Sequence, residues 1–299
     1  MIKWLSNCLV LEDGAVFRHL RLVQESVVNT DQGRLLLHNW KGLLRIQVTF
    51  KKAKLDRELI YVLVHNSYRG YYHWLLESLP KLLEAKRAVP SLTLLLPAYY
   101  QQSFYAETLH LLGITQVEWL QANTLYRVPQ LMLPHAAEKM GNYSVAALRE
   151  LKEAFWGAIG ILSSASAPKR LYISRRKATR RKVMNELEVE QVLITYGFQI
   201  VCFEDYSFQE QVRLCAGAEV LVGIHGAGLS NIVFLPERAT VIEFRKFDDG
   251  ENYFFTQLAV TLRHTYHLVY CTAEDEQKSV QDADLWVDTT ALQTMLKQL

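Results

Sequence analysis

A strand that runs directly into a glycine-flanked histidine constrains this chain more than any other feature. Residues 219–236 read EVLVGIHGAGLSNIVFLP. The run at 220–224 is short, apolar and rich in β-branched residues, which is typical of a strand buried on both faces of a parallel sheet. Gly226 and Gly228 lack side chains, so a ligand could approach the backbone closely, and an apolar helix is expected next. The stretch therefore predicts an α/β fold with a ligand-accessible turn after one of its strands.

The turn itself predicts an anion site. Backbone amides at 228–230 would open the helix, where they lack intrahelical partners and carry the positive end of the helix dipole. A phosphate is the simplest ligand for such amides. His225 ends the strand at the edge where open α/β sheets bind ligands. Two other interpretations stay open: the glycines serve only the packing of a tight turn, and His225 is a hydrogen-bonded histidine of the core.

Strand and helix patterns alternate along much of the chain, which predicts domain organisation. Five strand and helix units between residues 170 and 270 predict a parallel sheet with helices on both faces. The small, polar segment at 163–168 is typical of a linker. We expect three parts, which are an α/β domain, a second α/β domain and a C-terminal helical tail, at residues 1–162, 169–275 and 276–299.

The first domain is expected to begin with an additional β-rich segment. Short strand patterns, among them one at 43–50, fill residues 1–50 between turn signals. A basic stretch, Lys51-Lys52-Ala53-Lys54, then leads into a buried strand at 58–64.

Composition limits the classes of partner. With 299 residues, 50% of them hydrophobic, the chain can fold into two domains, and its net charge of +2 indicates no global field for nucleic acid or membrane. The 4 cysteines are far apart, as expected for buried thiols in a reducing compartment. Since no apolar run reaches the roughly 18 residues of a spanning helix, we expect a cytoplasmic protein with at most peripheral membrane association.

The one strong charge asymmetry lies early in the second domain. Residues 169–182 contain eight basic residues and no acid. Arg175 follows the first strand of this domain, at the same sheet edge as the His225 turn. Together with Arg180 or Arg181 it could bind a diphosphate, because guanidinium groups match phosphate oxygens bidentately. A solvated basic loop is the alternative.

A histidine and a glutamate form a candidate acid/base pair in the first domain. His73 and Glu77 are four residues apart on a predicted helix and therefore share a face. A carboxylate can hold one imidazole nitrogen and leave the other to accept a proton. We assign the proton to His73 because imidazoles titrate near neutral pH. The reverse assignment, with Glu77 as base, holds if burial raises the pKa of the carboxyl group. An ordinary helix pair is the remaining alternative.

Three further acidic residues are candidate ligands. Glu243 ends the strand after the glycine turn and could accept both hydroxyls of a ribose, or form a salt bridge with Arg245 or another arginine. Asp282 and Asp284 form a DxD motif, but no buried strand flanks it. We predict no metal site, because no other His, Cys and Asp cluster has metal-ligand spacing.

Together these motifs resemble glycosyltransferase family 61. The resemblance rests on ISRR at 173–176 followed by Asn185-Glu186, HGAGLSN at 225–231 with Phe234, VIEF at 241–244 and, more weakly, YHWLLE at 72–77. It implies a GT-B architecture, in which two Rossmann-like domains face each other across a cleft and the second holds a nucleotide sugar. It also implies inversion at the anomeric carbon, which requires a base on the acceptor hydroxyl.

On this resemblance we expect an inverting, metal-independent glycosyltransferase without a cofactor. It would move a sugar from a nucleoside-diphosphate sugar to a glycan or lipid-linked glycan during capsular or surface polysaccharide synthesis, as a bacterial-type enzyme of the cytoplasm or the inner-membrane surface. The expected catalytic residues are His73 and Glu77. The expected donor site consists of Arg175, Arg180, Arg181, His225, Gly226, Ala227, Gly228, Asn231 and Glu243.

Two other classes of function stay open. A non-catalytic nucleotide-sugar or glycan binding protein would show the same donor motifs. A nucleotide-dependent dehydrogenase would need GxGxxG after the first strand of a βαβ unit, where this chain has Ser174-Arg-Arg-Lys177. No nucleic-acid partner is expected, because the basic run lacks interleaved aromatic residues.

Overall fold

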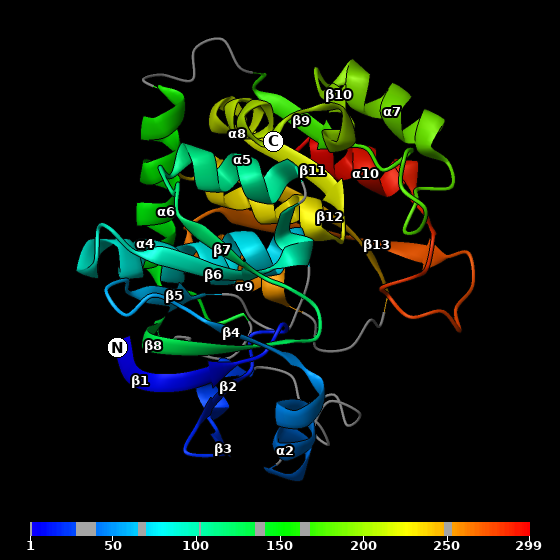
Figure 1. The fold of residues 1–299 in the computed structure, drawn as a ribbon. Helices are drawn as coiled ribbons and strands as arrows, with labels where there is room; N and C mark the ends of the chain where they lie inside the picture. The colour runs from blue at the N-terminus through cyan, green and yellow to red at the C-terminus, as the bar shows by residue number, and fades with distance from the viewer. Residues whose placement is uncertain are drawn as a thin grey trace. The chain divides into compact units, whose positions relative to one another are not determined.

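A computed structural model describes residues 2–27, 40–64, 70–101, 103–134, 141–161, 168–247 and 253–299 (Figure 1). The chain divides into two compact units, Met1–Ala137 and Glu138–Leu299. This division lies before the predicted linker at 163–168, most of which falls outside the described residues. Helix α6 (Val145–Ile159), which we had expected in the first domain, contacts helix α8 (Phe208–Gly217) within the second unit.

The first unit is built on a mixed sheet with the strand order β3-β2-β1-β8-β5-β6-β7, in which β4 also pairs with β8. The strands are β1 (Ile2–Val10), β2 (Val16–Arg18), β3 (Arg21–Leu22), β4 (Lys51–Lys54), β5 (Tyr61–Leu63), β6 (Thr93–Pro97), β7 (Val117–Leu120) and β8 (Thr124–Pro134). Strand β1 runs antiparallel to β8, whereas β4, β5, β6 and β7 pair in parallel. Strands β1, β2 and β3 confirm the additional β-rich segment predicted at the start of the chain, and they form an antiparallel edge on the parallel strands.

The helical segments of the first unit are η1 (Gln24–Ser26), α2 (Trp40–Thr49), α3 (Tyr71–His73), η2 (Trp74–Ser78), α4 (Leu79–Ala88), η3 (Ala98–Gln101) and α5 (Ser103–Leu111). The strand predicted at 43–50 is wrong, since these residues form most of α2. Ile46 is buried in a cluster with Phe17 and Leu125, whereas Val48 is exposed. Burial therefore follows a helical face, and a short apolar run does not distinguish this from a strand.

The second unit confirms the predicted parallel sheet. Its strand order is β10-β9-β11-β12-β13-β14, and every neighbouring pair is parallel except β13 with β14. The strands are β9 (Arg170–Ile173), β10 (Gln199–Val201), β11 (Val220–Ile224), β12 (Thr240–Lys246), β13 (Thr265–Ala273) and β14 (Leu285–Trp286). The predicted C-terminal tail belongs to this unit, because it supplies β14 and helix α10 (Thr289–Leu296).

Helices cover both faces of this second sheet. The helical segments are α6, α7 (Glu186–Thr195), η4 (Phe203–Asp205), α8, η5 (Ala227–Phe234), α9 (Phe254–Thr261) and α10 (Thr289–Leu296). One face packs Val222 and Ile242 against α7 and α10. On the other, α6, α8 and α9 all contact η5, and Phe155, Phe208 and Phe234 pack edge to face. The mixed α/β class is thus confirmed.

The connectivity places a ligand crevice at one point of this sheet. The chain passes from β9 outward to β10, then returns across β9 to β11 and continues in the other direction. Open α/β sheets bind ligands outside the carboxyl ends of strands at such a reversal. The segments after β9 and β11 are the ones that carry Arg175 and His225. Among the described helices, none is long and apolar enough to span a membrane.

Candidate functional site

The strand-to-helix turn after β11 is held firmly by its neighbours. The His225 amide donates to the carbonyl of Phe244 on β12 at 2.9 Å, and the Leu229 amide donates to the Gly226 carbonyl at 2.9 Å. The helix that follows is the 3-10 helix η5 instead of an α-helix. Ala227 is its first residue and Gly226 its N-cap, so the helix opens one residue earlier than the predicted amides at 228–230, and the Leu229 amide, which was expected to lack a partner, is already paired.

Two guanidinium groups converge on Gly226. A Cβ atom added there would lie 3.3 Å from Nη1 of Arg175 and 3.3 Å from Nη1 of Arg181. Arg175 is oriented by the loop beyond it, since its Nε and Nη2 donate to the carbonyls of Arg181 and Arg180, each at 3.1 Å. Arg181 donates from Nη1 to the His225 carbonyl at 3.2 Å. The lack of a side chain at Gly226 thus lets both cations approach the turn.

The convergence is electrostatically unfavourable without an anion. Burial, and then the charges of Arg175 and Arg180, lower the pKa of Arg181 to about 10. Burial likewise lowers the pKa of Arg175. The buried Nε of Arg181 has no hydrogen-bond partner among the described residues. A bound phosphate would reverse each of these penalties, because it supplies opposite charge and acceptor oxygens at the same place.

The rest of the basic run is largely neutralised locally. Four of its members meet carboxylates, in the pairs Lys169 with Glu219, Arg176 with Glu190, Lys177 with Asp205, and Arg180 with Asp282. The Arg180 pair is 2.8 Å long and its side chains are 59% and 53% exposed. Within the described part of the chain, Arg175 and Arg181 form no ion pair. The structure therefore separates two converging arginines from a run that the sequence presents as uniform.

His225 forms a buried pair with Glu243. Its Nδ1 lies 2.5 Å from Oε1 of the carboxylate, and the two side chains are 5% and 1% exposed. The other carboxylate oxygen lies 3.9 Å from Nη1 of Arg245. Burial, followed by the charge of Glu243, raises the pKa of the nearby phenol of Tyr266. The ribose contact predicted for Glu243 stays a prediction; the contacts observed here hold His225 and Arg245.

The remaining predicted donor residues lie on the same turn. Asn231 is fully buried and donates from Nδ2 to the Gly228 carbonyl at 3.1 Å, so it braces η5. A Cβ atom at Gly228 would meet Ile173 at 3.5 Å, an ordinary contact, so local packing does not require glycine there. The structure thus brings together Arg175, Arg181, His225, Gly226, Ala227, Gly228 and Asn231, while Arg180 pairs outward.

The predicted acid/base pair forms in the first unit. Nδ1 of His73 lies 3.0 Å from Oε2 of Glu77, and the two side chains are 18% and 19% exposed. Glu77 lies in η2, a five-residue π-helical turn inserted between α3 and α4. Such turns are rare and are often found at functional sites. The sequence reasoning missed Lys81. Burial lowers the pKa of its ammonium group, and the nearby charge of Glu77 offsets part of this shift. Its spacing of four residues from Glu77 was the signal that could have identified it.

The DxD aspartates have structural partners. Asp282 accepts from Arg180, and Oδ1 of Asp284 accepts from the Lys182 amide at 2.8 Å. These bonds tie the segment before β14 to the loop of the basic run. Over the described ranges, no group of three or more His, Cys, Asp and Glu side chains is arranged to hold a metal ion.

A parallel α/β unit with two arginines and a glycine turn at its strand reversal is an arrangement typical of α/β sheets that bind phosphate groups. The family is narrower. The model of Glycosyltransferase 61 matches residues 71–242, more than half of the 299, and the chain therefore belongs to glycosyltransferase family 61. The match includes His73, Arg175 and His225.

Curated relatives match a shorter part of the chain. The EGF domain-specific O-linked N-acetylglucosamine transferase of Gallus gallus is 34% identical over 89 residues, which is 28% of this chain and 17% of that protein. Its Drosophila melanogaster counterpart is 35% identical over 85 residues, 27% of this chain and 16% of the relative. Protein O-linked-mannose beta-1,4-N-acetylglucosaminyltransferase 2 of Xenopus tropicalis is 31% identical over 100 residues, which is 32% of this chain and 17% of that protein. The matches thus span less than a fifth of each relative.

Proposed function

We propose that this protein is an inverting glycosyltransferase that moves a sugar from a nucleoside-diphosphate sugar to a glycan acceptor. One observation carries the proposal: the guanidinium groups of Arg175 and Arg181 converge on Gly226 at the strand reversal. Negative charge builds up on the diphosphate as the sugar leaves, and donors fixed beforehand at that position stabilise it. Membership of family 61 supports the reaction class.

Each donor-site residue takes a stated part in this proposal. Arg175 and Arg181 bind the diphosphate, and the backbone amides at the start of η5 donate hydrogen bonds to its remaining oxygens. Glu243 holds Nδ1 of His225, so the imidazole keeps one orientation beside the turn. Because cationic side chains supply the positive charge, we propose transfer without a divalent metal; full activity in excess EDTA is the expected result.

The acceptor is activated by the pair in the first unit. With Nδ1–H directed at Glu77, the imidazole of His73 carries its lone pair on Nε2, which takes the proton of the acceptor hydroxyl as that oxygen attacks the anomeric carbon. A single displacement of this kind inverts the anomeric centre. The imidazolium that forms lies next to the Glu77 carboxylate, which stabilises its charge.

This chemistry requires the two units to cooperate. We propose the GT-B arrangement, in which the first unit, Met1–Ala137, is the acceptor-side domain and the second unit, Glu138–Leu299, is the donor domain. Small-angle scattering with and without a nucleoside diphosphate is the test. A two-lobed particle that contracts on binding supports GT-B, whereas a particle whose lobes do not face a common cleft contradicts it.

The relatives guide the choice of substrates. The names of all three relatives specify N-acetylglucosamine transfer, so a nucleoside-diphosphate N-acetylglucosamine is the first donor to test. For the acceptor we propose a glycan or lipid-linked glycan of a capsular or surface polysaccharide, made at the cytoplasmic side of a membrane by a bacterial-type enzyme. The same names favour a second candidate, transfer to a protein or to protein-bound mannose, and parallel acceptor assays separate the two.

Two adjacent arginines provide the sharpest test of the donor site. Arg181→Met should weaken binding of a nucleoside diphosphate by about 1.5 to 3 kcal/mol, since it removes a charged hydrogen bond. Arg180→Met removes the same charge one residue earlier, but its partner is the exposed Asp282, so affinity should stay within about twofold. Calorimetric titration measures both. Equal losses would mean that the run acts only through its net charge, and no loss in either would reject the site.

A binding protein without activity is the main competing function. It predicts the same calorimetric result but no turnover. Release of sugar from the nucleotide, measured with and without a panel of acceptors, decides between them. Donor binding without hydrolysis or transfer under any condition would favour the non-catalytic protein.

A further inference from the structure

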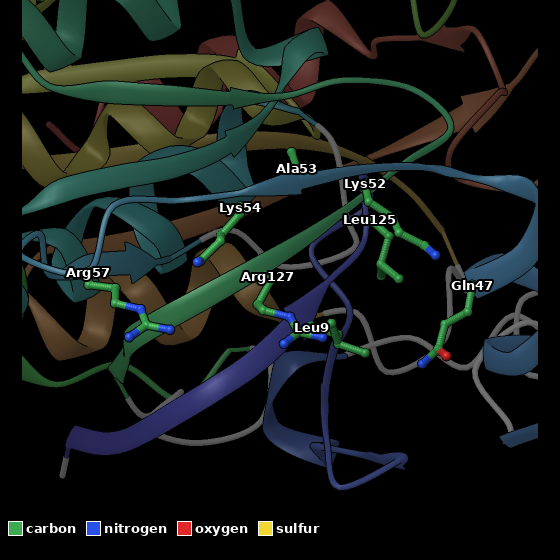
Figure 2. A pocket seen from close by; sticks show the side chains of 8 residues that line it. All are labelled: Leu9, Gln47, Lys52, Ala53, Lys54, Arg57, Leu125 and Arg127. Atoms are coloured by element: carbon green, nitrogen blue, oxygen red, sulfur yellow. The ribbon is translucent and has the colours of Figure 1, made fainter.

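A second cluster of cations lies in the first unit, far along the chain from the donor motifs. A groove of about 300 Å³ is lined by Leu9, Gln47, Lys52, Ala53, Lys54, Arg57, Leu125 and Arg127. Figure 2 shows the side chains of Lys54, Arg57 and Arg127 along one stretch of it, with Gln47 of α2 at the other end. Four of the eight lining residues are cationic, and none is a carboxylate or an aromatic ring.

The cations lie close together although local structure does not require it. Lys54 of β4 and Arg127 of β8 are direct partners in register on adjacent parallel strands. Like charges placed opposite one another on neighbouring strands destabilise a sheet. Lys52, Lys54, Arg57 and Arg127 are all exposed, and none forms an ion pair with a described carboxylate. Two acids flank Arg57 in the sequence, Asp56 and Glu58; neither lines the groove, and the Asp56 carboxylate accepts from the Glu58 amide.

The helix beside the groove adds exposed apolar surface. Ile46 anchors α2 in a cluster with Leu125, which is how Gln47 comes to line the groove. On the side of α2 away from Ile46, Leu44 and Val48 are 43% and 86% exposed, and around the helix the groove-lining Gln47 lies between Ile46 and these two residues. They lie four residues apart and so share a face, together with the exposed Arg45. Helices that lie on a lipid surface likewise expose apolar side chains, with basic residues on the neighbouring polar face.

We propose that this surface, the groove together with the exposed face of α2, binds the phosphate headgroups of an anionic membrane. The cations would contact lipid phosphates, and Leu44 and Val48 would enter the headgroup layer. Charge complementarity favours an anionic partner, and the lack of aromatic rings in the lining argues against a sugar, which usually stacks on them. The proposal does not depend on glycosyl transfer.

The position of the groove also separates it from the acid/base pair. It lies at the start of β8, where Lys54 pairs with Arg127, whereas β5, the strand before His73, pairs with Leu131 and Met132. Five residues of strand separate these registers, roughly 17 Å. A membrane bound at the groove would therefore contact the end of the sheet remote from the carboxyl end of β5.

Vesicle co-sedimentation of the full chain tests the proposal. We expect binding to vesicles of phosphatidylcholine with phosphatidylglycerol, little binding to phosphatidylcholine alone, and weaker binding as salt rises to about 0.15 M. The triple variant Lys52→Gln/Lys54→Gln/Arg127→Gln should bind about a hundredfold less, since each cation contributes about fivefold. Its thermal stability should stay the same or rise, because a repulsion is removed. If these residues had a purely structural role, the variant would lose thermal stability and keep its binding to vesicles.

Matched variants in the second unit serve as controls. Arg238→Gln/Lys297→Gln removes exposed cations there and should leave vesicle binding nearly unchanged. Val48→Ser should weaken binding, whereas Leu187→Ser, at a position 74% exposed on α7, should not. Equal losses in groove and control variants would overturn the proposal. The proposal would also be overturned if calorimetry detected pyrophosphate binding at the groove while the protein did not bind anionic vesicles.

Discussion

Each unit of this protein contains a histidine whose Nδ1 meets a carboxylate, and the two pairs differ most in burial. His225 and Glu243 are 5% and 1% exposed and 2.5 Å apart, whereas His73 and Glu77 are 18% and 19% exposed and 3.0 Å apart. The first is enclosed between β11, β12 and α9, with Phe255 against the imidazole. The second lies on a π-helical turn.

This difference indicates different work for the same two residue types. A buried pair is costly to break because either partner alone would be left unsatisfied, so it holds its surroundings in one arrangement. A partly exposed pair costs less to reorganise and can exchange a proton with a substrate. The comparison therefore favours a positioning role for His225 and Glu243 and, as proposed above, proton transfer by His73 and Glu77. The following predictions test it.

The largest effect is expected at the partly exposed pair of His73 and Glu77, and it should concern activity and not stability. His73→Ala should lower the transfer rate about a hundred- to ten-thousandfold by removing the base, with donor affinity and folding free energy nearly unchanged. Steady-state kinetics and calorimetry measure the two parts. Glu77→Gln should lose less. If it loses more than His73→Gln, Glu77 is the base. Transfer within a few fold of wild type in His73→Ala would remove the pair from catalysis.

The buried pair should show its effect on stability. Glu243→Ala leaves His225 and Arg245 facing a cavity and should lower the free energy of unfolding by about 3 to 5 kcal/mol. Glu243→Gln retains an acceptor for the imidazole and should lose less. Urea unfolding of both, beside Glu77→Ala, measures the contrast. Equal destabilisation by Glu243→Ala and Glu77→Ala would break the comparison.

A third histidine extends the comparison, because it is buried with no carboxylate partner among the described residues. His264 is 8% exposed, and burial, followed by the charge of Lys152, lowers its pKa from 6.5 to about 4. Folding therefore favours the neutral imidazole. The free energy of unfolding is therefore highest above about pH 6.5 and falls as the pH is lowered towards about 4. The loss is about 2 kcal/mol at pH 5. Urea unfolding should show this slope in wild type and less of it in His264→Gln; identical slopes would contradict the assignment.

The smallest effect is expected where both partners face solvent. Arg180 and Asp282 form a 2.8 Å pair that is 59% and 53% exposed. Asp282→Asn should leave the urea midpoint unchanged within error, because such pairs are screened. A shift as large as that of Glu243→Gln would show that this contact fastens the loop of the basic run, and the order of effects would then not follow burial.

The second unit was accessible to sequence reasoning because its signals are local. The apolar run 220–224, the glycines beside His225 and the alternation of strands with helices predicted the parallel sheet and the turn at its edge. The pairing of His73 with Glu77 followed from helical spacing alone. The ordered motifs also identified the family, to which the profile match assigns the chain.

Tertiary structure decided what depends on distant neighbours. Residues 43–49 form a helix and not a strand, because the helical conformation packs Ile46 on Leu125, which is far along the chain. The eight cations of 169–182 are alike in sequence, yet partners up to a hundred residues away neutralise Arg180 and leave Arg181 facing Gly226. Likewise, Lys54 meets Arg127 only through strand pairing. Local periodicity determines which elements form, whereas burial and charge pairing are properties of the packed chain, and these decide what each side chain can do.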